Sequence, residues 1–210
     1  MIKLKIKDIE AKLGKTIRRN CISVGFDVAE HFTGVCVLKA DKEFITIDDT
    51  QVIETSANED HFNRADHYIA TLGKFKQKLE EYKNYKILVI EACHFGKNPQ
   101  TLIHLAHFGI LTYRELKKSF DTWHYFGAST ARSMVGFNQK NQQKNGTFKA
   151  ELYKRDTKDK AGKLKHKKGE KKKVDCKSLV HNYLETEFGL KFDSKDEADA
   201  FVLALAGLLA

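Results

Sequence analysis

Four acidic residues stand where divalent-cation chemistry would need them. Asp27 and Glu91 each end a short apolar run of the kind that forms a buried strand. Open α/β sheets place their ligands at the carboxyl ends of strands, so both acids are candidates for one site. Asp196 and Asp199 lie three residues apart near the start of a predicted helix, and they therefore project from one face of it.

These side chains offer only oxygen ligands, with no convincing histidine or cysteine among them, which suits Mg²⁺ or Mn²⁺ rather than zinc. Two such ions about 4 Å apart would activate a water and stabilise the leaving oxygen of a phosphodiester. Each acid also has a structural explanation, as a turn cap, an ion-pair partner or a charge at a helix N-terminus. Their combination favours the metal site. Glu197 is better explained by a capping box with Ser194.

The positive charge of the chain is concentrated in one segment. The formal net charge is +9, but residues 137–173 hold 14 Lys and Arg against 4 Asp and Glu, a net of +10, which leaves −1 elsewhere. The segment has few large apolar side chains, so we expect a mobile basic insertion that packs no core of its own. Nucleic acid is the leading partner for such a stripe. A solvated linker and a localisation signal around residues 165–173 are the alternatives.

The periodicity of apolar residues predicts the elements that must position the acids. Strands are expected at 21–27, 33–38, 44–53, 87–91 and 122–126. Helices are expected at 56–79, 98–120, 129–135, 174–188 and 195–210. The first helix is expected to begin with a capping box of Ser56 and Glu59, and the second with Asn98 ahead of Pro99.

This order of elements predicts an α/β fold with a five-stranded mixed sheet flanked by helices. Residues 1–20 are interpreted as an N-terminal extension, and residues 21–210 as one domain that carries the basic insertion at 137–172. Trp123 could stack on or wedge between bases, but it lies in a strand expected to be central, which favours a place in the core. Asp48 and Asp49 are interpreted as the solvent side of a strand or a bend, not as ligands.

Several classes of protein are excluded on composition. The longest apolar run, residues 200–210, is eleven residues long, against the ~20 that a helix needs to cross a bilayer. No apolar stretch of signal-peptide length follows the N-terminus. The four cysteines lie far apart, as reduced thiols do. We therefore expect no membrane span and a location in the cytoplasm, with the nucleoid, or in a viral or organellar interior.

Three motifs follow one another in a characteristic order. They are Gly25-Phe26-Asp27 followed by Thr33-Gly34-Val35, then Glu91 followed by Asn98, Thr101 and Gly109, then Asp196, Asp199 and Ala200 opening an apolar helix. In order and spacing they resemble the motifs of the RuvC-type Holliday junction resolvases, within the RNase H-like (integrase and resolvase) superfamily. The resemblance covers roughly residues 21–210, and residues 1–20 and the long basic insertion have no counterpart in it.

This resemblance implies an RNase H-like fold and a Mg²⁺-dependent endodeoxyribonuclease of DNA recombination and repair. Such an enzyme nicks four-way junctions symmetrically as a homodimer, with Asp27, Glu91, Asp196 and Asp199 as catalytic metal ligands. Arg132 resembles the basic position after the fifth strand, and Lys173 resembles the lysine that opens the next helix. Together with the charge of the insertion and one loop aromatic, this gives the expected DNA contacts: Phe95, Asn98, Arg132, Lys140, Lys144, Lys149 and Lys173.

Two other functions are compatible with the same residues. One is an RNase H-like nuclease with another substrate, such as an RNA-DNA hybrid, a flap or a guide-directed target. The other is a nucleic-acid-binding protein without catalysis, against which the four intact acids argue. Zinc is not expected at His104 and His107, since no cysteine pair stands at zinc spacing. The contact surface of a dimer is expected on the 98–120 helix, whose apolar face holds Leu102, His104, Leu105, Phe108 and Leu111.

Overall fold

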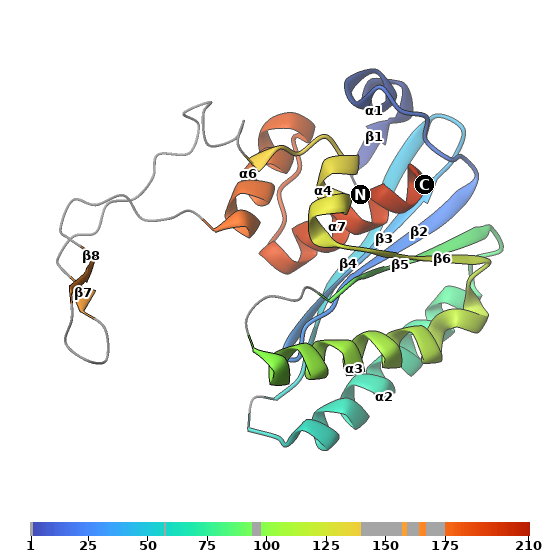
Figure 1. The fold of residues 1–210 in the computed structure, drawn as a ribbon. Coiled ribbons are helices and arrows are strands. Elements are labelled where there is room, and N and C mark those ends of the chain that lie inside the picture. Colours follow the sequence, from blue (N-terminus) through green and yellow to red (C-terminus); the bar gives the residue numbers. More distant parts are fainter. Residues whose placement is uncertain (1, 57, 94–97, 140–156, 159–163, 167–174) are drawn as a thin grey trace. The chain divides into compact units, whose positions relative to one another are not determined.

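The computed structural model describes residues 2–56, 58–93, 98–139, 157–158, 164–166 and 175–210. The chain forms two units, residues 1–137 with 192–210, and residues 138–191. The first unit contains the main sheet and all four candidate carboxylates, so it is the unit that positions the predicted site (Figure 1).

The main sheet is mixed and has the strand order β1-β4-β3-β2-β5-β6. Its strands are β1 (Lys3–Lys5), β2 (Cys21–Asp27), β3 (Phe32–Ala40), β4 (Phe44–Glu54), β5 (Tyr85–Glu91) and β6 (Thr122–Phe126). The first four strands in this order pair antiparallel, while β5 is parallel to both β2 and β6. The predicted α/β class and mixed sheet are confirmed. The sheet has six strands rather than five, because β1 pairs with β4.

Residues 1–20 are integrated into the fold instead of extending from it. After β1 the chain forms α1 (Ile6–Leu13), which ends at Gly14 in the left-handed conformation. Ile6, Ile9 and Ile17 are buried, and the backbone N–H of Arg18 donates to the carbonyl of Leu208 at 2.8 Å. The apolar spacing of these residues is therefore explained by packing.

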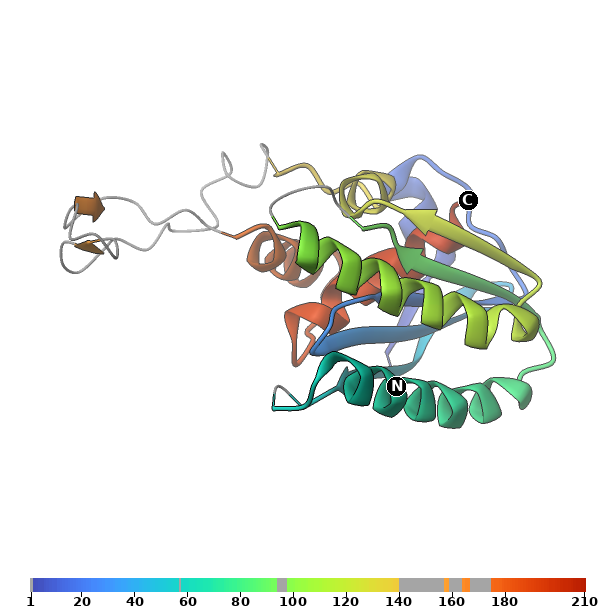
Figure 2. The same ribbon diagram turned by 60° about the horizontal axis from the view of Figure 1, so that its bottom comes forward.

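Helices cover both faces of the sheet. They are α2 (His61–Glu80), α3 (Pro99–Leu116), α4 (Ala128–Met134) and α7 (Lys195–Leu208), with a short 3₁₀ helix at Lys117–Ser119. Helices α2 and α3 lie side by side on one face, and α7 lies on the other face with α4 beside it (Figures 1 and 2). Between the sheet and the α2–α3 layer, Phe26, Tyr68, Leu72 and Phe108 belong to one buried apolar cluster. This layering makes the sheet a rigid base for residues at its edge.

Two local predictions in this unit are wrong. Helix α2 is capped by Asp60, whose carboxylate accepts from the N–H groups of Phe62 and Asn63 at 2.9 Å, and not by a Ser56–Glu59 box. Trp123 is 47% exposed, because β6 is an edge strand of the sheet and not a central one.

The two aspartates of β4 lie at an irregularity of the sheet. The register with β3 shifts between Val37 and Leu38, so that Val37 pairs with Asp49 and Leu38 with Ile47. Asp48 therefore has no partner in the β3–β4 ladder, as in a β-bulge. Lys78 of α2 pairs with Asp49 at 2.9 Å, and the hydroxyl of Tyr82 donates to Asp48. These contacts tie the end of α2 to the sheet, in agreement with the predicted bend.

The second unit contains α6 (Cys176–Phe188) and a short antiparallel pair, β7 (Thr157–Lys158) with β8 (Leu164–His166). Asp175 caps α6, and Gly189 ends it in the left-handed conformation, at the end expected for the 174–188 helix. Phe137, at the expected start of the insertion, is only 7% exposed and belongs to the first unit. The insertion therefore begins after Phe137.

No helix within the described ranges has the length and apolar character needed to cross a membrane. None of the four cysteines forms a disulfide, and Cys21 and Cys36 are buried.

Two glycines let the backbone of α7 approach the sheet very closely. Gly25 of β2 lies against the main chain of Ala200, and Gly34 of β3 lies against the main chain of Asp196. A Cβ at either glycine would overlap these backbone atoms, which cannot move aside as a flexible side chain can. Gly34 also pairs with Asp27 across the β2–β3 ladder. The glycines therefore set how near the first turn of α7 lies to Asp27.

We predict that Gly34→Ala destabilises the protein by about 1–3 kcal/mol, because the added methyl group overpacks a contact between backbones. Gly73→Ala is the matched control, since a Cβ at Gly73, inside α2, meets nothing within 4 Å. It should be neutral or stabilising by up to about 1 kcal/mol through helix propensity. Urea unfolding followed by circular dichroism measures both. Equal stability of the two variants would contradict the close approach of α7.

Candidate active site

Two of the candidate acids end neighbouring parallel strands. In the β2–β5 ladder Phe26 pairs with Ile90, so Asp27 and Glu91 are the next residue of each strand. Asp27 is 3% exposed and Glu91 is partly buried. The apolar runs that precede them form buried strands, and the acids stand at the shared carboxyl edge. The structure confirms this placement.

The other two acids belong to the first turn of α7. Ser194 caps the helix through a 3.0 Å hydrogen bond from the N–H of Glu197, whose carboxylate accepts from the N–H of Ser194 at 3.0 Å. The predicted capping box is thus confirmed, and Glu197 has a structural role. The main chain of Asp196 packs on Gly34, directly across the ladder from Asp27. Asp199, one turn further along, is 4% exposed.

Arg132 of α4 binds the carboxylate of Asp199. Its Nη2 donates to Oδ2 at 2.9 Å and to Oδ1 at 3.0 Å, and its Nε lies 3.3 Å from Oδ1. Glu91 lines a small pocket together with Arg132 and Asp199. The remaining walls of this pocket are Ala128, Ala131, Val202 and Leu203. Two carboxylates and one guanidinium, from the sheet edge, α4 and α7, therefore line the same pocket.

The donor set fits a hard dication in type, since it consists of carboxylates. Burying Asp27 and Asp199 as anions is costly unless a cation or hydrogen-bond donors compensate, and Arg132 supplies one such cation at Asp199. No three of the four acids bring ligand oxygens within 4.8 Å of one another. Mg²⁺ or Mn²⁺ would be held by Asp27, Glu91, Asp196 and Asp199, which offer only oxygen ligands.

The expected DNA contacts are only partly described. Asn98 is exposed and caps α3, accepting from the N–H of Gln100 at 3.0 Å. Arg132 has a side chain that is 15% exposed and already engaged by Asp199. The other expected contacts lie outside the described residues: Phe95, Lys140, Lys144, Lys149 and Lys173.

The exposed apolar face of α3 differs from the expected contact face. Phe108 and Leu111 point into the core, so they are not available for a dimer contact. The exposed apolar residues of the helix are Ile103, at 65%, and Ile110, at 60%. Tyr113 of the same helix packs edge-on against Trp123 of β6 at 4.8 Å between ring centroids.

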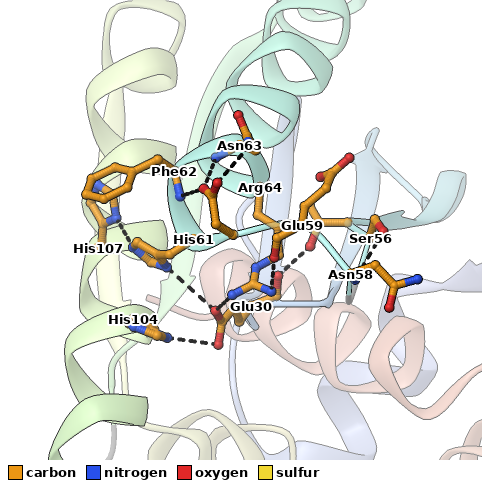
Figure 3. Close-up of polar contacts among 12 residues, drawn as sticks. Glu30, Ser56, Asn58, Glu59, His61, Phe62, Asn63, Arg64, His104 and His107 are labelled. Atoms are coloured by element: carbon orange, nitrogen blue, oxygen red, sulfur yellow. Dashed lines mark hydrogen bonds and ion pairs between the residues drawn. The ribbon is translucent and has the colours of Figure 1, made fainter.

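A second polar cluster was missed by sequence reasoning. Glu30, in the loop after β2, contacts His61 of α2 and His104 of α3, and it also binds Arg64 (Figure 3). Desolvation acts to raise the pKa of Glu30, but the hydrogen bond from His104 and the charges of His104 and Arg64 hold that pKa below its ordinary value. His104 and His107 carried the only signal, as one face of a helix. Nothing local marks Glu30 or His61 as their partners.

A comparison with protein-family models and a search of curated proteins found no match. Solved structures do match. Thermus thermophilus RuvC in complex with a Holliday junction substrate is 12% identical, with a TM-score of 0.58 over 88% of this chain and 91% of that one.

A second Thermus thermophilus RuvC structure is 14% identical, with a TM-score of 0.54 over 88% of this chain and 92% of that one. The yeast mitochondrial Holliday junction resolvase Ydc2 is 10% identical, with a TM-score of 0.50 over 95% of this chain and 82% of that one. The chain therefore has the RuvC-type, RNase H-like fold that its motifs predict.

We predict that Arg132→Met lowers the free energy of unfolding by about 3 kcal/mol, because it leaves the carboxylate of Asp199 buried and uncompensated. Adding Asp199→Asn should recover part of this loss, and Mg²⁺ should stabilise the single variant more than the wild type. Arg114→Met is the control, since Arg114 is 63% exposed in its pair with Glu115 and should change stability little. Urea unfolding with and without Mg²⁺ measures these changes in the free energy of unfolding. If Mg²⁺ stabilised wild type and Arg132→Met equally, Arg132 and Mg²⁺ would not compete for Asp199.

Proposed function

We propose that this chain is a structure-selective endodeoxyribonuclease that resolves four-way DNA junctions by Mg²⁺-dependent hydrolysis. The observation that carries the proposal is the convergence of four acids from β2, β5 and α7 at one edge of the sheet. Its support from comparison is the fold, shared with a RuvC structure that contains a Holliday junction substrate.

Asp27, Glu91, Asp196 and Asp199 would hold two Mg²⁺ ions, or Mn²⁺ in their place. Bound there, the ions supply an activated water and stabilise the leaving oxygen of the phosphodiester. The chain contributes the positions of the ligands: β2 and β5 fix Asp27 and Glu91, and the capped first turn of α7 fixes the aspartates. Arg132 would exchange Asp199 for a DNA phosphate, because a guanidinium that gives up a carboxylate in a partly buried site needs another anion.

We propose that the basic insertion binds the rest of the junction. The net charge of +10 over residues 137–173 contrasts with the nearly neutral remainder of the chain, and lysine and arginine contacts to phosphates supply affinity without sequence preference. Lys140, Lys144, Lys149 and Lys173 are proposed phosphate contacts, with Phe95 and Asn98 near the branch point. Such an activity belongs to DNA recombination and repair, in whichever compartment holds the DNA.

A homodimer follows from the symmetry of the substrate. A four-way junction presents two strands of like polarity related by a two-fold axis, and one set of four acids can cut only one of them. Paired incision therefore requires two copies of the chain in an isologous contact. Ile103 and Ile110 lie seven residues apart, hence on one face of α3, and both are exposed. This face is the proposed contact surface.

Substitution of the acids tests the chemistry. Asp27→Asn, Glu91→Gln and Asp199→Asn should each remove most of the nicking of labelled four-way junctions in Mg²⁺, while junction binding persists, because losing one charge from a shared site weakens both ions. Asp196→Asn should be milder if it holds one ion. The exposed Asp193→Asn serves as the control and should keep wild-type rates. The same assay is run on flaps, duplexes and RNA-DNA hybrids. Faster cleavage of a hybrid than of a four-way junction would reassign the substrate. A Glu91→Gln variant that still cleaves at the wild-type rate would rule out the proposed metal ligands.

Disruption of the α3 face tests the dimer. Ile110→Glu should yield monomers that lose paired incision, because a buried charge opposes an apolar contact between copies. Ile2→Glu is the matched control, since Ile2 is also exposed, at 44%, but lies next to β1. Analytical ultracentrifugation with and without a junction, and mapping of nicks on both strands, give the readouts. A wild-type protein that stays monomeric on the junction, or makes a single unpaired nick at saturation, would refute the dimer.

A further inference from the structure

Three side chains with metal-binding chemistry meet outside the proposed catalytic set. Glu30 follows β2 by three residues, His61 opens α2 and His104 lies in the second turn of α3. One ligand atom from each lies within 4.8 Å of the other two, the only such group of three acid, histidine or cysteine side chains among the described residues (Figure 3). None of the three belongs to the four carboxylates discussed above.

The distances within this cluster are close to those of a coordination shell. Nδ1 of His104 lies 3.0 Å from Oε2 of Glu30, and Nδ1 of His61 lies 3.6 Å from Oε1. Two ligands of a tetrahedral zinc ion, with bonds near 2.1 Å, lie about 3.3–3.5 Å apart. The two imidazole rings stack at 4.1 Å between centroids with an interplanar angle of 23°, and both direct Nδ1 towards the same carboxylate. Small adjustments would let one ion contact all three side chains.

His61 provides an independent indication of a cation site. Its Nδ1 is buried and makes no hydrogen bond with any described residue, while its Nε2 lies 2.7 Å from Nδ1 of His107. If Nε2 of His61 is the donor, Nδ1 carries a lone pair that faces the Glu30 carboxylate. Two acceptors that face each other need a cation between them.

The surroundings of the cluster resemble the outer shell of a metal site. A histidine ligand usually donates its second ring N–H to another group, as His61 can to His107. The ligating carboxylate is usually held as well, and Arg64 donates to Oε1 of Glu30 while its other terminal nitrogen donates to the carbonyl of Glu59. Oε2 of Glu30 then remains directed at His104. Each candidate ligand is thus oriented by a neighbour.

We propose that Glu30, His61 and His104 bind one Zn²⁺-type transition-metal dication, separate from the catalytic Mg²⁺ ions. Two imidazoles and one carboxylate select such an ion over Mg²⁺, which prefers oxygen ligands. The ion would join the loop that directly follows Asp27 to the start of α2 and to α3. Its role would be structural, to hold the segment beside the active site in place, with water as the fourth ligand.

Binding of Co²⁺, a spectroscopic probe for zinc sites, tests the proposal on the full-length protein stripped of metal. Wild type should show visible d–d absorption that saturates at one Co²⁺ per chain and is displaced by Zn²⁺. His61→Gln and His104→Gln should each weaken Co²⁺ binding at least tenfold. His67→Gln, an exposed histidine on α2, is the matched control and should bind as wild type does. Thermal unfolding should shift upwards with Zn²⁺ in wild type and His67→Gln only.

The double variant Asp27→Asn/Asp199→Asn separates this site from the catalytic one, since it should keep the Co²⁺ signal. Loss of the signal in that variant, with retention in His104→Gln, would overturn the proposal by placing the ion among the catalytic acids. Absence of a saturable signal in the wild type would overturn it as well. So would a melting temperature that ignores Zn²⁺ but falls as pH rises through the titration of histidine, because a proton would then be the cation at this site.

Discussion

The contact between the backbone of α7 and the sheet is the constraint on which the rest of the structure depends. Gly25 and Gly34 remove the two side chains that would hold the helix away, and main-chain atoms of Ala200 and Asp196 occupy that space. From residue 197 to residue 208 the helix is buried throughout, so its position is set by packing over its whole length. An aspartate at its first turn is consequently brought to the end of β2, where Asp27 stands.

That geometry carries an electrostatic cost, which the fold offsets locally. Asp27 and Asp199 are both almost fully buried, and an isolated buried carboxylate is strongly unfavourable. Arg132 compensates Asp199 from α4, so the helix that follows β6 has an electrostatic role besides its packing. At the other side of the β2 end, Glu30 is surrounded by Arg64, His61 and His104. The four acids offer a cation only oxygen ligands, and the cluster around Glu30 offers both nitrogen and oxygen ligands.

How much of this could be predicted depends on whether the signal is local. The strands ending in Asp27 and Glu91, and the Ser194–Glu197 box, are patterns of adjacent residues, and the structure contains them as predicted. The predicted cap of α2 is wrong because Ser56 and Asp60, four residues apart, both offer a side-chain acceptor. The pairing of β1 with β4 and the edge position of β6 are set by long-range contacts. The same holds for the cluster of Glu30, His61 and His104, whose members are far apart in sequence.

The most direct test of the central claim, that α7 completes a two-metal site of four acids, is a crystal structure of the protein in Mn²⁺ with anomalous scattering data. The account predicts two Mn²⁺ peaks about 4 Å apart, bound by Asp27, Glu91, Asp196 and Asp199, with Arg132 withdrawn from Asp199. A map with no peak among these acids at saturating Mn²⁺, and with Arg132 still on Asp199, would contradict it.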